Sequence, residues 1–403
     1  MWENGVDIYN VRVIRAKTNL YFGVGAIAYF REIADQLAAR GVTSVLVVTG
    51  HGSYKKSGAW AVVGKILDDC KFQYALYDGV SPNPTTTQTD EAVAAGRAVN
   101  AQAVVAIGGG SPIDTGKSAA ILLKHPGRTA RELYSQGFTP EGALPIVAIN
   151  LTHGTGTEVN RFAVLSIPET EQKPVIAYDC IYPTWSIDDP ALMAGLSPEQ
   201  TRFVSIDAVN HVIEAATSKA ANPFAIMLGR DTIQLVVRYL PFVEKDPSDL
   251  NARYFLLYAS MLAGMAFDNG LLHYTHALEH PLSALKPELA HGLGLAVLLP
   301  AVVQAIYPQK AQILAELLQP LAPGLQGKAD EAHEAGKAVQ AWLNRCGVSQ
   351  KLRDVGFTKE DVEKLVDMTL QEPSLASLLE QAPGYANATS VAAIYMNSFL
   401  PLV

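Results

Sequence analysis

The stretch AQAVVAIGGGSPIDTGK (101–117) decides the fold of the first half of this chain. A β-branched apolar run ends in three consecutive glycines, and a segment with helical character follows at once. A buried strand that turns sharply into a helix is the repeating unit of parallel α/β sheets. Because glycines let the backbone approach closely and free N–H groups at a helix start attract anions, the same stretch predicts a phosphate-binding turn.

The same rhythm continues on both sides of this stretch. Further buried strands are predicted at 42–50, 72–79 and 143–150, and helices at 26–41 and 87–101. Short apolar runs that alternate with helices indicate a doubly wound α/β domain with a parallel sheet. From about residue 190 the pattern changes to long helical periodicity. We therefore predict an α/β domain at 1–189 and an all-helical domain at 190–403.

Composition and charge limit the possible functions. Of the 403 residues, 49% are hydrophobic and 17% charged, which is typical of a folded globular protein. A net charge of -8 argues against a nucleic-acid partner. Cys70, Cys180 and Cys346 form no close pair, which favours a reducing compartment. The start lacks a secretory signal, and the longest apolar run (293–307) is broken by Pro300 and shorter than the ~20 residues of a membrane span. We expect a soluble cytoplasmic protein.

A helix that carries two possible metal ligands has a readable start. Ser197 suits the N-cap, Pro198 the first helical position and Gln200 the third residue after the cap. Asp207 and His211 are four residues apart, so their side chains lie on one face of this helix. Their neighbours on that face are mostly apolar, and Asp207 is therefore predicted to be buried. A buried carboxylate is costly unless it is paired or binds a metal.

Further histidines follow in HYTHALEHPLSALKPELAH (273–291). Imidazoles together with one carboxylate suit Fe(II) or Zn(II). His276 and His280 also share a helix face, so spacing alone does not decide between His280 and His291 as a ligand. For His273 a hydrogen-bonded role in the core is the more common outcome.

Two glycine-rich turns supply candidate contacts to a nucleotide. The first turn follows the strand at 103–107, and the second, THGTGTEVN (152–160), follows the strand at 143–150, so both lie where open α/β sheets bind ligands. The candidate residues are Gly108, Gly109, Gly110, Ser111, Asp114 and Lys117 in the first turn, and Thr152 and Thr155 in the second.

A third turn, TGHGSYKKSG (49–58), bears on the choice of nucleotide. A site selective for NAD usually places an acidic side chain near the adenosine ribose. This turn has none, and offers Gly50, Gly52, Ser53 and Lys56 instead. The sequence therefore favours NADP(H) over NAD(H).

Taken together, these motifs resemble the iron-containing (group III) alcohol dehydrogenases, and within them the butanol-dehydrogenase-like branch. The resemblance covers essentially the whole chain. The matching pieces are YFGVGAI (21–27), SPNPT (81–85), GGGSPIDTGK (108–117), THGTGTEV (152–159), DAVNHVIEA (207–215), ASMLAGMAFDNGLLHYTHALEHPLSA (259–284) and HGLGLAVLLP (291–300).

The resemblance implies a dinucleotide-binding domain followed by a helical domain, in a dehydroquinate synthase-like fold. It implies that one Fe(2+), with Zn(2+) as the alternative, is held by Asp207, His211, His276 and His291. The expected reaction is hydride transfer between NAD(P)(H) and a short- or medium-chain primary alcohol or aldehyde. His280 then becomes a residue near the metal, expected to act in a proton relay.

Two other functions fit the sequence less well. A lyase of the dehydroquinate-synthase kind would need several basic residues near the metal, and few are available. A polyol dehydrogenase fits less well, because Phe162, Phe267 and Leu271 are expected to give the pocket an apolar lining. We also expect a homodimer, formed when a strand near the start of the chain (7–17) pairs with its copy at a sheet edge.

Overall fold

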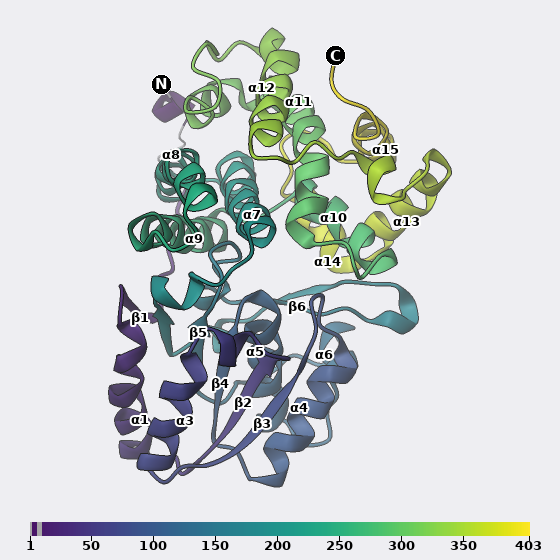
Figure 1. The fold of residues 1–403 in the computed structure, drawn as a ribbon. Coiled ribbons are helices and arrows are strands. Elements are labelled where there is room, and N and C mark those ends of the chain that lie inside the picture. The colour runs from purple at the N-terminus through teal and green to yellow at the C-terminus, as the bar shows by residue number, and fades with distance from the viewer. Residues whose placement is uncertain (1, 6–9) are drawn as a thin grey trace. The chain divides into compact units, whose positions relative to one another are not determined.

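The computed structural model describes residues 2–5 and 10–403 of the chain (Figure 1). Contacts divide the chain into two compact units that are discontinuous in sequence. The α/β unit consists of Ala16–Thr201 and Phe242–Met261, and the helical unit of Met1–Arg15, Arg202–Pro241 and Leu262–Val403. The functional boundary placed between 189 and 190 stays a prediction.

The α/β unit is built on a six-stranded parallel sheet with the strand order β1-β8-β5-β4-β2-β3. Its strands are β1 (Asn19–Phe22), β2 (Ser44–Gly50), β3 (Gln73–Val80), β4 (Ala103–Gly108), β5 (Ile146–Asn150) and β8 (Trp185–Asp188). The four predicted strands are β2 to β5, so the predicted parallel α/β class is confirmed. Strands β1 and β8 were not predicted, nor was the antiparallel pair β6 (Phe162–Val164) and β7 (Val175–Ala177).

Helices cover both faces of this sheet. They are α1 (Phe30–Ala39), α2 (Ser53–Lys56), α3 (Ala59–Asp69), α4 (Thr86–Ala98), α5 (Gly110–Lys124) and α6 (Ala130–Tyr134). Successive strand residues point to opposite faces. Val45 and Val47 therefore pack with α1 and α3 in one core, and Leu46 and Val48 with α4, α5 and α6 in the other (Figure 1).

The helical unit takes most of the remaining helices. These are α7 (Pro198–Thr217), α8 (Pro223–Lys245), α9 (Leu250–Gly270), α10 (Tyr274–Leu285), α11 (His291–Leu317), α12 (Ala332–Arg345), α13 (Val362–Gln371), α14 (Pro373–Glu380) and α15 (Ala388–Asn397). Helices α7, α8 and α9 each have residues in both units. The predicted start of α7 is confirmed, because the N–H of Gln200 donates to Oγ of Ser197 at 3.1 Å.

Short 3-10 helices complete the secondary structure of the described residues. They are η1 (Trp2–Gly5), η2 (Ala26–Tyr29), η3 (Thr157–Val159), η4 (Pro168–Thr170), η5 (Asp179–Ile181), η6 (Pro190–Met193), η7 (Ala329–Glu331), η8 (Leu352–Val355) and η9 (Lys359–Asp361).

Two expectations about the chain need correction. Residues 10–17 of the predicted N-terminal strand have no strand structure, and the first part of that prediction (7–9) lies outside the described residues. Helix α11 continues through Pro300 and Pro308, with non-helical angles only at Lys310, so it is longer than the apolar run suggested. By length and composition α11 passes as a membrane span, but 72% of its most apolar window is buried inside the structure, as in a core helix.

Candidate metal centre and nucleotide loops

Helix α7 carries three acidic or imidazole side chains on one face. Asp207 and His211 are one turn apart, and Glu214 follows one turn later. All three are buried, which the apolar neighbours of Asp207 had predicted for Asp207 alone. Oδ1 of Asp207 lies 3.4 Å from Nε2 of His211 and 3.6 Å from Nε2 of His276 on α10.

The two downstream helices bring further histidines to this face. The possible ligand atoms of Asp207, His276 and His291 all lie within 4.8 Å of one another, and His291 is the first residue of α11. The rings of His211 and His276 stack with centroids 4.7 Å apart. The structure therefore brings together all four residues of the predicted ligand set. His280 lies beside them, with its ring 5.9 Å from that of His291.

Two glutamates orient the histidines. Glu214 accepts hydrogen bonds from the Nδ1–H of His276 and from the backbone N–H of Thr275 at 2.6 Å. Glu279 is bonded to Nδ1 of His291 in the same way. A carboxylate on one ring nitrogen leaves the other, Nε2, to face a metal. Sequence reasoning missed both glutamates, although Glu214 repeats the helical spacing of the ligand pair.

The donor set fits a divalent cation. Oδ1 of Asp207, Nδ1 of His211 and Nε2 of His276 are buried and have no hydrogen-bond partner. Buried polar atoms are normally paired, so Oδ1 of Asp207 and Nε2 of His276, which lie 3.6 Å apart without a hydrogen-bond partner, call for a ligand. One carboxylate with three imidazoles suits Fe(II) or Zn(II).

Electrostatics favours a charged carboxylate at Asp207 and a neutral imidazole at His211, whereas it favours the protonated form of His276. Burial raises the pKa of Asp207, but the nearby His211 and two other histidines outweigh it and hold that pKa at about 2. Burial lowers the pKa of His211 to about 4. For His276, burial is outweighed by Glu214 and Asp207, which raise its pKa to about 9.

The remaining predicted residues of the helical unit differ in their contact with the proposed ligands. Phe267 stacks on the His211 ring, with centroids 4.4 Å apart. Leu271 follows the end of α9, with its N–H donating to the carbonyl of Phe267 at 2.7 Å. His273 is not placed as a ligand: its Nδ1 caps α10 by accepting from the N–H of Tyr274. Phe162, the third predicted pocket residue, belongs to the α/β unit, in β6.

The two predicted glycine turns lie against each other in the α/β unit. A Cβ on Gly109 would come within 2.7 Å of the Thr152 side chain, and a Cβ on Gly110 within 2.8 Å of Thr155. A Cβ on Gly108 would overlap Pro112. The glycines are thus required by close packing between the turns, and Gly110 begins α5 with Ser111 as the next residue.

The side chains of Asp114 and Lys117 are turned into the protein. Lys117 is buried and Asp114 is half-buried, and both are bonded to the chain that follows the second glycine turn. His153 of that turn is also buried, and Nη1 of Arg253 on α9 lies 3.1 Å from its Nε2. Arginine can only donate, so Nε2 accepts and the imidazole is neutral. Burial, with a smaller effect of Arg253, lowers the pKa of His153 to about 3.

The third predicted turn leads from β2 into α2. Gly50 ends β2, and Ser53 and Lys56 are exposed at the two ends of α2. The hydroxyl of Tyr54 donates to Asp78 near the end of β3 at 3.2 Å. This acidic residue was missed, because it is distant in sequence from the turn.

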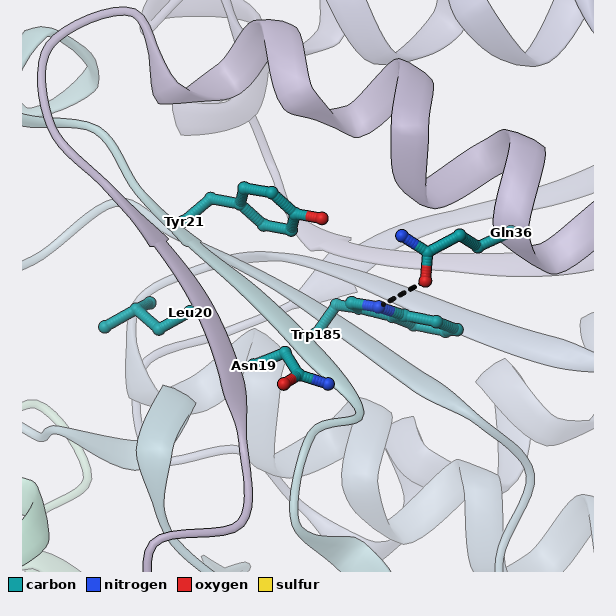
Figure 2. A pocket seen from close by; sticks show the side chains of 5 residues that line it. All are labelled: Asn19, Leu20, Tyr21, Gln36 and Trp185. Atoms are coloured by element: carbon teal, nitrogen blue, oxygen red, sulfur yellow. Dashed lines mark hydrogen bonds between the residues drawn. The ribbon is translucent and has the colours of Figure 1, made fainter.

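A separate hollow of about 420 Å³ lies at the outer strand of the sheet. Figure 2 shows its lining, in which Nε1 of Trp185 donates to Gln36 at 3.1 Å. The other lining residues are Asn19, Leu20 and Tyr21 of β1. It contains none of the predicted metal or nucleotide residues.

Comparison with protein families matches nearly the whole chain. Residues 17–190 match the family model described as iron-containing alcohol dehydrogenase, and residues 203–399 match the C-terminal model of the same family. A long-chain primary alcohol dehydrogenase of Thermoanaerobacter ethanolicus is 55% identical over 99% of this chain and 100% of its own. A 1,3-propanediol dehydrogenase of Klebsiella pneumoniae is 35% identical, over 94% of this chain and 96% of its own.

Solved structures agree with these matches. The NADH-dependent butanol dehydrogenase A of Thermotoga maritima is 27% identical with a TM-score of 0.86, covering 96% of this chain and 98% of its own. A 1,3-propanediol oxidoreductase is 32% identical with a TM-score of 0.87, covering 97% and 100%.

Proposed function

Because the chain belongs to the iron-containing alcohol dehydrogenase family, we propose that Asp207, His211, His276 and His291 hold its catalytic metal. The enzyme transfers a hydride between a nicotinamide nucleotide and an alcohol or aldehyde. The observations that carry the ligand assignment are the ligand atoms of Asp207, His276 and His291, which lie within 4.8 Å of one another, and the ring of His211, which stacks on that of His276. Iron is the proposed metal, with zinc as the alternative that the same donors accept.

The residues around the metal have distinct proposed roles. When bound, the metal acts as a Lewis acid on the substrate oxygen, and the nicotinamide exchanges the hydride. Glu214 and Glu279 hold the imidazoles in position. Oxidation of an alcohol also releases one proton, and His280 is proposed to pass it to solvent. A His280→Ala enzyme with full metal content and an unchanged pH–rate profile would remove His280 from that role.

For the nucleotide we propose contacts with the three glycine turns and a preference for NADP(H). Exposed Ser53 and Lys56 support a 2′-phosphate site beside Gly50 and Gly52. The negative charge of Asp78 would repel a 2′-phosphate, although the Tyr54 hydroxyl already donates a hydrogen bond to this carboxylate. Ser53→Asp should then lower kcat/KM for NADPH relative to NADH by roughly tenfold or more, because like charges repel.

We propose unbranched primary alcohols and aldehydes as substrates. Apolar Phe267, which stacks on the His211 ring, supports this over polyols. The relative at 55% identity, named for long-chain primary alcohols, supports testing chain lengths beyond the short and medium range. A cytoplasmic homodimer remains part of the proposal, and a monomer in light scattering would reject the dimer.

The test combines metal analysis with turnover. Protein purified anaerobically is analysed for iron and zinc. Oxidation of NADPH and NADH is then measured with straight-chain aldehydes of increasing length. A series of polyols is tested in the opposite direction, by the reduction of NADP+ and NAD+. We expect one metal per chain and turnover of the aldehydes. Metal-loaded protein that oxidises neither nucleotide with any aldehyde would overturn the proposal.

A further inference from the structure

One buried lysine holds the chain that follows the second glycine turn. Nζ of Lys117, on α5, lies 2.6 Å from the carbonyl oxygen of Thr157, 2.7 Å from its Oγ1 and 2.8 Å from the carbonyl of Phe162. The carbonyl of Asn160 is 3.0 Å away. An ammonium group has three N–H donors, so these oxygens occupy all of them and none is left for a phosphate.

Asp114, one turn earlier on α5, completes the arrangement. Its carboxylate accepts from the Thr157 hydroxyl at 2.7 Å and from the N–H of Val164 at 2.9 Å. The Thr157 hydroxyl therefore donates to Asp114 and accepts from Lys117. Lys117 is fully buried and Asp114 is half-buried, and hydrogen bonds to charged groups are among the stronger ones in proteins.

The segment bonded by Lys117 (157–162) is continuous with the second glycine turn, which packs on the glycines of the first turn. Thr155 lies against Gly110 and Thr152 against Gly109. Helix α5 begins at those glycines and carries Lys117 two turns later. The two glycine turns and the first part of α5 thus pack together as one unit, and the hydrogen bonds of Lys117 hold this unit together.

We infer that Lys117 is a positioning residue, which prepares both glycine turns for the nucleotide through Thr157 and without contacting a phosphate. The inference rests on the proposed function for the identity of the ligand. It assigns Lys117 a role different from the direct contact that its place in the sequence suggested.

The test uses two conservative changes with matched controls. Thr157→Val removes the shared hydroxyl, and Lys117→Arg keeps the charge but cannot place one nitrogen among these oxygens. Thr115→Val is the control for the first, because Thr115 is equally buried on α5 but its hydroxyl has no partner. A third variant, Lys117→Met, removes the charge, and Lys124→Met, at the end of α5, is its control.

NADPH affinity is measured by fluorescence titration of the full chain at several salt concentrations. Thr157→Val and Lys117→Arg should weaken binding by roughly tenfold or more, as expected for loss of a hydrogen bond to a charged group. Amide hydrogen exchange in 151–165 should become faster, KM for the nucleotide should rise more than kcat falls, and the salt dependence of binding should match the wild type. Both controls should bind and exchange as the wild type does.

Three results would overturn the inference. The first is wild-type NADPH affinity in Lys117→Arg, and the second is unchanged hydrogen exchange in 151–165 in both Thr157→Val and Lys117→Arg. The third is a shallower salt dependence of NADPH binding in Lys117→Met, which would indicate direct contact between the lysine charge and the nucleotide. Because binding is measured without turnover, a failure of the dehydrogenase proposal would appear separately, as NADPH binding without any aldehyde reduction.

Discussion

At the scale of single residues, Glu214 fixes the orientation of one proposed metal ligand, His276. It is fully buried, and its oxygens accept from the backbone N–H groups of His273 and Thr275 as well as from the ring of His276. The same carboxylate therefore fixes both the start of α10 and the imidazole that α10 carries. Such supporting carboxylates matter for metal affinity almost as much as the ligands do.

Glu214→Gln should lower metal affinity by roughly 10- to 100-fold, because the amide no longer supplies a charged acceptor to the His276 ring. Affinity is measured by competition with a chelator, together with the metal content of purified protein. Glu199→Gln, an exposed glutamate in the first turn of α7, is the control. Equal metal affinity in Glu214→Gln and wild type would contradict this role.

Two further carboxyls, Glu158 and Asp188, are buried close enough to interact. Both oxygens of Glu158 and Oδ2 of Asp188 have no hydrogen-bond partner, while Asn150 donates to Oδ1 of Asp188 at 3.1 Å. Burial raises the pKa of Glu158 to about 7. Burial, together with the charge of Glu158, raises the pKa of Asp188 well above its usual range.

This pair makes stability fall as the pH rises. Both folded-state pKa values are raised, so the folded protein binds more protons than the unfolded chain above about pH 4. The contribution is complete at lower pH and is lost as the pH rises through 7. Asp188→Asn, which keeps an acceptor for Asn150, should therefore stabilise the protein at pH 8 by at least about 1 kcal/mol. Thermal unfolding from pH 5 to 8.5 checks this, and an unchanged pH slope in the variant would contradict it.

Residue spacing predicted some of these features and could not predict others. The Asp207–His211 pair and the burial of Asp207 followed from helical periodicity. A glutamate on a helix, however, looks the same in sequence whether it faces solvent or a histidine sixty residues later, as Glu214 does. Lys117 was expected at the nucleotide for a similar reason, because its acceptors lie 40 or more residues further along the chain.

At the scale of elements, the metal centre depends on how closely α11 approaches α7. A Cβ on Gly292 would lie 2.2 Å from the carbonyl oxygen of Phe203 in α7. Gly292 directly follows His291, the proposed ligand at the start of α11. Only glycine lets the two helices approach this closely at that point.

Gly292→Ala should push the start of α11 away from α7, carry His291 with it and cost about 1–3 kcal/mol, as overpacking usually does. The expected result is a lower melting temperature together with weaker metal binding. Gly324→Ala is the control, since a Cβ there meets nothing within 4 Å. A loss of stability without any loss of metal affinity would show that the helix contact does not position His291.

Elements were predictable where they were long or strongly patterned. Strands β2, β4 and β5 are buried along their whole length in the interior of the sheet, and each was predicted. The edge strand β3 was predicted as well. Strands β1 and β8 have only four residues each, and their pairing with each other joins segments more than 160 residues apart. Within one chain, residues 10–17 of the predicted strand over 7–17 form no strand, and Val11, Val13 and Ile14 are exposed there. Pairing of this segment with a second copy stays a prediction.

At the scale of the whole molecule, the α/β unit is incomplete without a segment from α8 and α9. Phe242–Met261 belongs to this unit although forty residues of the helical unit precede it. Its Arg253 bonds His153 and Thr201, and its Tyr254 packs edge-on against Phe22 with ring centroids 4.8 Å apart.

A fragment that ends at Thr201 should therefore fold poorly, even though it contains the entire sheet. Without Arg253 and Tyr254, the buried His153 and the apolar face of Phe22 lose their partners. Circular dichroism and thermal unfolding of the fragment should show no cooperative transition, whereas the full chain should show one. A fragment that unfolds cooperatively and binds NADPH would contradict this.

Because the α/β unit consists of two segments separated by part of the helical unit, the nascent chain is affected during translation. The sheet is fully synthesised once Thr201 has been added, yet its last supporting segment ends only at Met261. At about 5–20 residues per second, the ribosome needs about 3–12 seconds to add those sixty residues. During that interval the growing chain exposes apolar surface that its own later part will cover. Slowing translation between these two points should therefore increase its dependence on chaperones.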